Sequence, residues 1–104
     1  MKFYDRSGRE VSREEGVALF GEDRVVAQDM CVAGYVSTVH LVLDHNHSGE
    51  GDPLIFETMV FDGEGTAGCW RYSTEDAARE EHTKVFKALL AGVDFRAEMY
   101  SPIA

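Results

Sequence analysis

The clearest pattern in the chain is an alternation of side chains between residues 35 and 44. Successive side chains of a β-strand point to opposite faces, so this alternation predicts one strand with two distinct faces. The first face is the more apolar and is the predicted core face, whereas the second mixes apolar and polar residues. The two sets are Tyr35, Ser37, Val39, Leu41 and Leu43, and Val36, Thr38, His40, Val42 and Asp44.

A second strand is predicted after Pro53, in the segment PLIFETMVFD, and the polar segment NHSGEGD before it suits a hairpin loop. Placing His45 opposite Leu54 sets a register for this hairpin, and a slip of one residue would exchange the two faces. The further pairs that this register predicts are Leu43–Phe56, Leu41–Thr58 and Val39–Val60 on the core face, and His40–Met59 and Val42–Glu57 on the mixed face.

The strongest helix signal spans about 74–91. Ser73 or Thr74 can cap its first turn, and Gly92 suits its end. Apolar side chains recur within it at the three- and four-residue spacing of an amphipathic helix. These positions are Ala78, His82, Val85, Phe86, Leu89 and Val93.

The remaining segments predict shorter pieces. KFYDRSGREVS suits two short strands about a turn, and SREE is a capping box that opens a short helix of about 13–21. Gly34 either divides the strand-rich segment before the hairpin loop into two strands or marks a bulge in one. Residues 69–72 suit a short extended piece, and the tail after residue 92 is an edge strand or an ordered arm.

These pieces predict a single α+β domain over residues 1–104. We expect a mostly antiparallel sheet of three to five strands. The long helix should pack on one face of this sheet, with the short helix near the N-terminus. A chain of this length can bury one core without staples.

Charge narrows the possible functions. Nineteen acidic and ten basic residues give a net charge of −9, which excludes general nucleic-acid binding and disfavours an anionic membrane. An acidic surplus can simply serve solubility, or it can dock a basic partner or imitate DNA. Cys31 and Cys69 are expected to be buried free thiols. Without a signal-peptide pattern or a long apolar run, the expected location is the cytoplasm.

Three of the four histidines lie in HLVLDHNHSGEGDP, residues 40–53. On a continuing strand His45 and His47 would point to one side and could begin a transition-metal site. A third ligand would have to come from elsewhere. The candidates are Glu50, Asp52 and His82. Alternatively, Asp44 and Asn46 end the strand by bonding nearby backbone amides, and the histidines lie in a solvated loop. No other cofactor is expected.

Other residues invite a catalytic interpretation. Glu57 and His40 could form an acid–base pair on the mixed face, and Cys69 beside Arg71 could be a nucleophile, but no recognisable catalytic spacing supports either. The candidates for catalysis are Asp44, His45, Glu57 and His82. The apolar neighbours of Glu57 favour an interaction surface instead. Its predicted residues are His40, Glu57, Met59 and Arg71.

Four segments form a larger pattern. A Ser-Thr-Val strand that ends in Leu-Asp-His is followed by Phe-Glu-Thr-Met-Val-Phe, then by Arg-Tyr-Ser-Thr, which opens a helix with a later histidine. In these segments, over about residues 36–86, the chain resembles small proteins encoded by actinobacterial phages and prophages. The matching positions are Ser37 to Val39, Leu43 to His45, Phe56 to Phe61, Arg71 to Thr74 and His82.

The resemblance implies a small phage accessory protein made in the host cytoplasm, and it carries no known activity. The pattern often has a glycine in place of Val42 and aromatic residues in place of His40 and His47. These departures weaken both histidines as functional residues. The polar residues that remain to be tested are Asp44, His45, Glu57, Arg71 and His82.

Three functions remain open. The first is non-enzymatic binding of a host or viral protein in a host-takeover or counter-defence role, which a homodimer could perform. The second is a metal-binding protein or metal-dependent enzyme built around Asp44 and His45. The third is a virion or assembly component. The lack of a convincing catalytic set favours the first.

Overall fold

All strands except the first two join one sheet. The computed structural model describes residues 1–102, and it confirms the predicted α+β class. The elements in chain order are β1 (Phe3–Tyr4), β2 (Glu10–Val11), α1 (Arg13–Leu19), β3 (Val25–Cys31), β4 (Gly34–His40), β5 (Phe56–Asp62), β6 (Gly65–Tyr72), α2 (Glu75–Leu90) and α3 (Phe95–Glu98).

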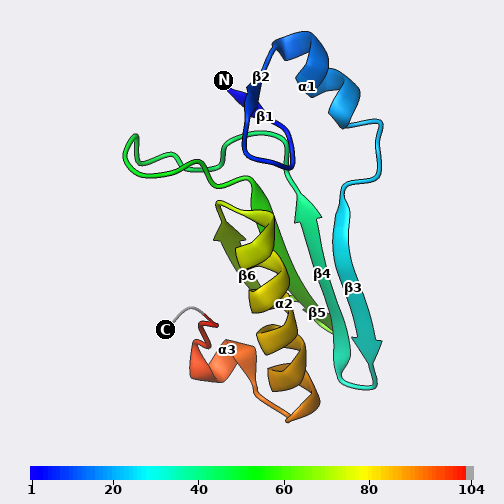
Figure 1. Cartoon of the computed structure of the whole chain (residues 1–104). Helices are drawn as coiled ribbons and strands as arrows, with labels where there is room; N and C mark the ends of the chain where they lie inside the picture. Colours follow the sequence, from blue (N-terminus) through cyan, green and yellow to red (C-terminus); the bar gives the residue numbers. More distant parts are fainter. Residues whose placement is uncertain (103–104) are drawn as a thin grey trace.

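The main sheet is an antiparallel meander in which each strand pairs with the next along the chain. Its order is β3-β4-β5-β6, while β1 and β2 form a separate two-stranded sheet. α2 crosses one face of the main sheet and contacts all four strands, which confirms the predicted packing of the long helix (Figure 1). The small sheet and α1 lie beyond the end of the main sheet, near the loop that joins β4 to β5 (Figure 1).

Local capping signals set the helix boundaries. α2 begins after Thr74, whose hydroxyl accepts a hydrogen bond from a first-turn N–H at 3.1 Å. It ends just before Gly92, which adopts a φ of 84°, a conformation that glycine tolerates best. α1 begins after Ser12 in the same way and ends at Leu19, two residues before the predicted end.

Other boundaries differ from the predictions. The tail forms the short helix α3 rather than a strand or arm, because the Asp94 carboxylate accepts hydrogen bonds from two N–H groups of its first turn. β6 is longer than the predicted piece at 69–72. Gly34 does divide its segment into two strands. Both cysteines are free as predicted, but Cys69 is exposed and Cys31 only half-buried, so the prediction of buried thiols is wrong.

The predicted core face of β4 is also wrong. The face that α2 covers carries the even-numbered residues 36 to 40, each 1% exposed or less. On β5 the prediction is right, because the even-numbered residues 56 to 60 are buried under α2. The observed pairs are Tyr35–Phe61, Val36–Val60, Ser37–Met59, Thr38–Thr58, Val39–Glu57 and His40–Phe56.

Three extra residues after β4, which do not pair with β5, explain why the core face of β4 was predicted wrongly. The N–H of His45 donates to the Leu54 carbonyl at 2.9 Å, so the first predicted contact is present. The N–H of Leu41 donates to the Ile55 carbonyl at 2.7 Å. Between these two contacts, residues 42–44 leave the hairpin and bond to the first strand and the residue before it. A shift by an odd number of residues exchanges the faces of β4 relative to β5.

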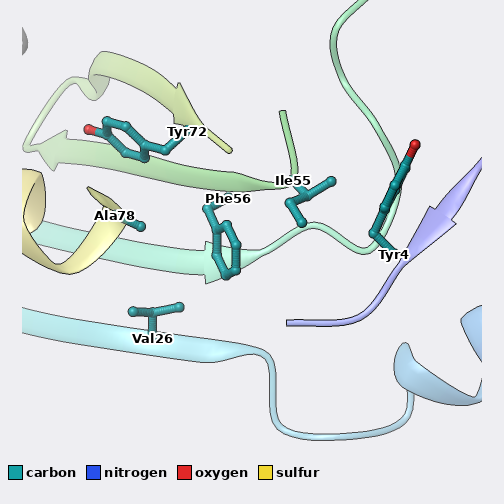
Figure 2. Packing of buried hydrophobic residues seen from close by; sticks show 6 residues of the cluster. All are labelled: Tyr4, Val26, Ile55, Phe56, Tyr72 and Ala78. Atoms are coloured by element: carbon teal, nitrogen blue, oxygen red, sulfur yellow. The ribbon is translucent and has the colours of Figure 1, made fainter. Parts of the chain in front are cut away.

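Two apolar clusters fill the space between the sheet and α2. One joins the small sheet to the main sheet, and Figure 2 shows Ile55 lying between Phe56 and Tyr4. The second lies toward α3 and contains Val36, Val60, Val85, Leu89 and Phe95. The core is therefore continuous along the helix side of the sheet.

The outer edge of β3 is partly covered by two arginines. Arg6 and Arg79 donate to the carbonyls of Val25 and Val26 at 3.4 and 3.3 Å. Glu75 of α2 accepts from both guanidinium groups, at 2.7 and 2.8 Å. The hydrogen bond from Arg6 is the main reason that the pKa of Glu75 lies below its usual value.

Candidate functional site

One face of the main sheet has no covering layer among residues 1–102. α2 packs on the opposite face, and α3 joins the core on that same side through Phe95. We call the uncovered surface the open face. It consists of Gln28 and Met30 of β3, Tyr35, Ser37 and Val39 of β4, Glu57, Met59 and Phe61 of β5, and Cys69 and Arg71 of β6.

The open face carries apolar and aromatic side chains. Tyr35 and Phe61 lie opposite each other on neighbouring strands, and their rings stack with centroids 5.8 Å apart. Val39 and Met59 are half-buried only because their neighbours shield them. Met30, on the edge strand, is 75% exposed. Apolar side chains left without cover in this way favour contact with another surface.

The charges on the open face are balanced. Glu57 and Arg71 lie opposite each other on β5 and β6, and their side chains form an ion pair at 3.0 Å. The Arg71 side chain remains 41% exposed, so this pair adds little to stability. Its effect is to leave the open face without net charge. Three of the four predicted interaction residues, Glu57, Met59 and Arg71, therefore lie together.

The acidic surplus lies elsewhere on the described part of the chain. The acids of residues 1–102 that have no basic side chain within the 4.0 Å ion-pair distance are Glu14, Glu22, Asp23, Asp44, Glu50, Asp52, Glu64, Asp76, Asp94 and Glu98. None of them belongs to the open face. They occur near α1, in the loop before β5, in the turn before β6, at the start of α2 and around α3.

The fourth predicted interaction residue, His40, does not belong to this surface. It is 1% exposed and lies opposite Phe56 under the helix layer, and its Nε2 has no hydrogen-bond partner among residues 1–102. Burial is the main cause that lowers its pKa, and the nearby Arg6 and Arg24 lower it further. The predicted acid–base pair of His40 with Glu57 is wrong, because the two side chains lie on opposite faces of the sheet.

A chain of polar side chains crosses the core instead. His82 of α2 bonds through Nε2 to the Asp29 carboxylate at 2.8 Å and through Nδ1 to the Thr38 hydroxyl at 2.7 Å. The Thr38 hydroxyl also bonds to that of Thr58, at 2.5 Å. These contacts tie the helix to three strands.

This row of hydrogen-bonded side chains joins an acid, an imidazole and a hydroxyl, as nucleophilic catalysis requires. It offers a substrate no access to the hydroxyl groups. Both threonines are fully buried, and His82 is 3% exposed. Each hydroxyl is already bonded inside the core. The geometry therefore indicates a structural role for His82, the one catalytic candidate in this network, and the satisfied polar groups fix α2 on the sheet.

Sequence reasoning missed the partners of His82. Thr38 and Thr58 were present in the pattern that resembles the phage proteins, within Ser-Thr-Val and Phe-Glu-Thr-Met-Val-Phe. The fold brings these two threonines together with the later histidine of the pattern. It also joins Glu57 to Arg71, which come from two of its segments. Asp29 lies outside the pattern, and no sequence signal pointed to it.

The histidine-rich stretch forms an ordered loop. The Asp44 carboxylate accepts hydrogen bonds from the N–H groups of Asn46 and Leu54 at 2.7 and 2.9 Å, so it bonds backbone amides as predicted. It does not end the strand, however, because β4 already ends at His40. The His45 ring bonds through Nδ1 to the Leu43 carbonyl.

The structure does not complete the proposed metal site. The rings of His45 and His47 lie 6.1 Å apart, while His82 is in the core. Over residues 1–102, no three His, Cys, Asp or Glu side chains are grouped so that they could hold a metal ion.

Cys69 lies on the open face, but its chemistry differs from that of an activated nucleophile. Partial burial of the thiol raises its pKa, and the Glu57 carboxylate raises it further against the opposing effect of Arg71. A raised pKa keeps the sulfur protonated and unreactive. The position therefore contributes a small side chain to the surface.

Comparisons with protein-family models, curated proteins and solved structures found no match for this chain. Within residues 1–102, no helix is both long and apolar enough to cross a membrane. The case for a function therefore depends on the chain's own surfaces and on the resemblance described above.

Proposed function

We propose that this chain is a phage-encoded accessory protein of the host cytoplasm that acts by binding a host or viral protein. A host-takeover or counter-defence role fits this activity. The observation that supports it best is the open face, a sheet surface with stacked aromatic rings, valine and methionine but no covering element among residues 1–102. The resemblance over residues 36–86 supports the phage origin.

The polar groups favour binding over catalysis. The imidazole of His82 and the hydroxyls of Thr38 and Thr58 are buried in the core, and only their acid, Asp29, is exposed. The exposed ion pair of Glu57 and Arg71 already satisfies its own charges. No observation favours the metal-dependent alternative. A virion or assembly component could use the same open face, and co-purification with phage particles would distinguish that role.

The test is partner capture with surface variants. Ser37 lies in the middle of the open face, so Ser37→Arg adds bulk and charge without removing an apolar contact. Thr83→Arg, on the exposed side of α2, is the matched control. A protein captured from lysate of phage-infected host cells would be purified and its affinity measured for each variant. We expect the affinity for the captured protein to fall at least tenfold in Ser37→Arg and to stay unchanged in Thr83→Arg.

Two results would contradict the proposal. One is a captured partner that binds Ser37→Arg as tightly as the wild type. The other is the lack of any partner that binds the purified wild-type protein. Far- and near-UV circular dichroism would first establish that both variants are folded.

A further inference from the structure

We infer that the open face binds a second copy of this chain, giving a dimer in which two sheets pack face to face. The inference depends on the proposal that the open face is a protein-binding surface, and it names the partner. Its support is the charge distribution, the size of the face and the arrangement of side chains at its centre.

Charge decides first between a second copy and a basic partner. Two chains of net charge −9 repel each other, and this repulsion is weakest when they meet through a surface without net charge, because the unpaired acids of the two copies then stay far apart. The open face is such a surface, because its one acid, Glu57, is paired with its one base, Arg71. A basic partner would instead be attracted to the unpaired acids, which all lie away from this face.

The size of the face is enough for a specific but small interface. Four strands of seven or eight residues cover about 440 Å² per copy when strand spacing and rise are multiplied. The two copies together present about 900 Å² of flat sheet area, and the uneven surface of the side chains adds to it. This area is close to the lower limit of specific interfaces. We therefore expect a dimer that dissociates on dilution rather than an obligate one.

The centre of the face is suited to self-packing. Ser37 and Met59 lie opposite each other on the two central strands, with Tyr35–Phe61 on one side and Val39–Glu57 on the other. A serine beside a methionine places a short and a long side chain together, so two such surfaces can interdigitate as packed sheets do. In such a dimer the two-fold axis lies in the plane between the two packed sheets. If the axis passes through the middle of the open face, the Ser37 side chains of the two copies lie close together.

The dimer would have a consequence for other partners. It would cover the apolar side chains of both sheets and leave the helices and the unpaired acids outside. A host or viral protein that binds the open face would therefore compete with the second copy, and it would bind the monomer that dilution releases.

The proximity of the two Ser37 side chains gives a charge-exchange test. Sedimentation velocity would be measured between about 1 μM and about 1 mM, a range that includes the dissociation constants expected of small interfaces. Wild type and Thr83→Arg should shift from monomer to dimer as concentration rises. Ser37→Arg alone and Ser37→Glu alone should remain monomeric, because like charges meet near the axis. An equimolar mixture of these two variants should regain the dimer.

The outcomes separate this inference from the proposed function. A wild type that is monomeric throughout, or a Ser37→Arg that dimerises like the wild type, would overturn the second-copy inference. If the monomeric wild type still captures a partner that Ser37→Arg loses, the open face binds a different protein and the proposed function stands. If neither association nor capture responds to Ser37→Arg, both are wrong.

Discussion

At the scale of single residues, the buried polar groups serve the fold, and their individual contributions should differ. The Thr38 hydroxyl bonds to both His82 and Thr58, whereas the Thr58 hydroxyl has Thr38 as its one hydrogen-bond partner within residues 1–102. Removing a shared partner leaves two buried polar groups without a bond, and an unsatisfied group costs more than a lost bond. The network should therefore be more sensitive at Thr38 than at Thr58.

Valine substitutions test this difference. Thr38→Val should lower the free energy of unfolding by about 2 kcal/mol, and Thr58→Val by about 1 kcal/mol. Urea unfolding followed by tryptophan fluorescence measures both values. Equal effects, or a larger one at Thr58, would show that the hydrogen-bond chain does not set the stability of this region.

His40 should make stability depend on pH. Its folded-state pKa is lowered by burial, so the unfolded chain binds the proton more readily than the folded one. The corresponding stability is complete above the usual histidine pKa of 6.5 and is lost as the pH falls below it. Asp5, Asp62 and Glu75 also have lowered pKa values, but they titrate below this window.

His40→Phe checks the origin of this dependence. The phage pattern often has an aromatic residue at this position, and the ring of Phe56 lies 5.2 Å from that of His40. The wild type should melt at a lower temperature at pH 5.5 than at pH 7.5. The melting temperature of the variant should fall much less between the two pH values. A variant that keeps the full pH dependence would place its origin in other groups.

At the scale of elements, close backbone approach should make one glycine indispensable. A Cβ at Gly34 would collide with the carbonyl oxygen of Phe61 on the neighbouring strand. Gly34→Ala should therefore destabilise the protein by about 2–3 kcal/mol, as overpacking does. Gly63→Ala is the control, because a Cβ there would meet nothing within 4 Å. Its effect should stay within about 0.5 kcal/mol in urea unfolding, and similar losses for both variants would refute the explanation.

The two longer helices, α1 and α2, were predictable because their signals are local. Thr74 and Gly92 fix the ends of α2 within a residue or two of the sequence prediction, and the apolar spacing identifies its buried side. Strand faces depend on register, which the three extra residues at 42–44 changed. Val42 occupies the left-handed region, with a φ of 70°, where a β-branched residue is rare.

The candidate site was predictable only in part, because the faces of its strands depend on the register. Glu57 and Met59 lie on β5, where the predicted pairing identified the outer positions correctly, whereas no face was predicted for Arg71 of β6. His40 lies on β4, whose faces were exchanged, so it was assigned to the surface although it belongs to the core. Tyr35 was assigned to the core by the same error, and it is one of the stacked rings of the open face.

At the scale of the whole molecule, composition and structure together give more than either alone. A net charge of −9 says only that the surface is acidic. The structure divides that surface into a charge-balanced apolar sheet face and acidic regions around the helices and loops. This separation leaves the open face, rather than the acidic regions, as the surface on which the proposed association depends.

The arginines at the outer edge of β3 have a consequence for the stoichiometry of assembly. A strand with unpaired backbone groups is a template onto which another strand can add, and repeated addition leads to fibres. Arg6 and Arg79 already occupy two carbonyls of that edge, and Glu75 holds both guanidinium groups in place. Growth by strand addition is therefore opposed at this end of the edge, which favours a closed pair over an open filament.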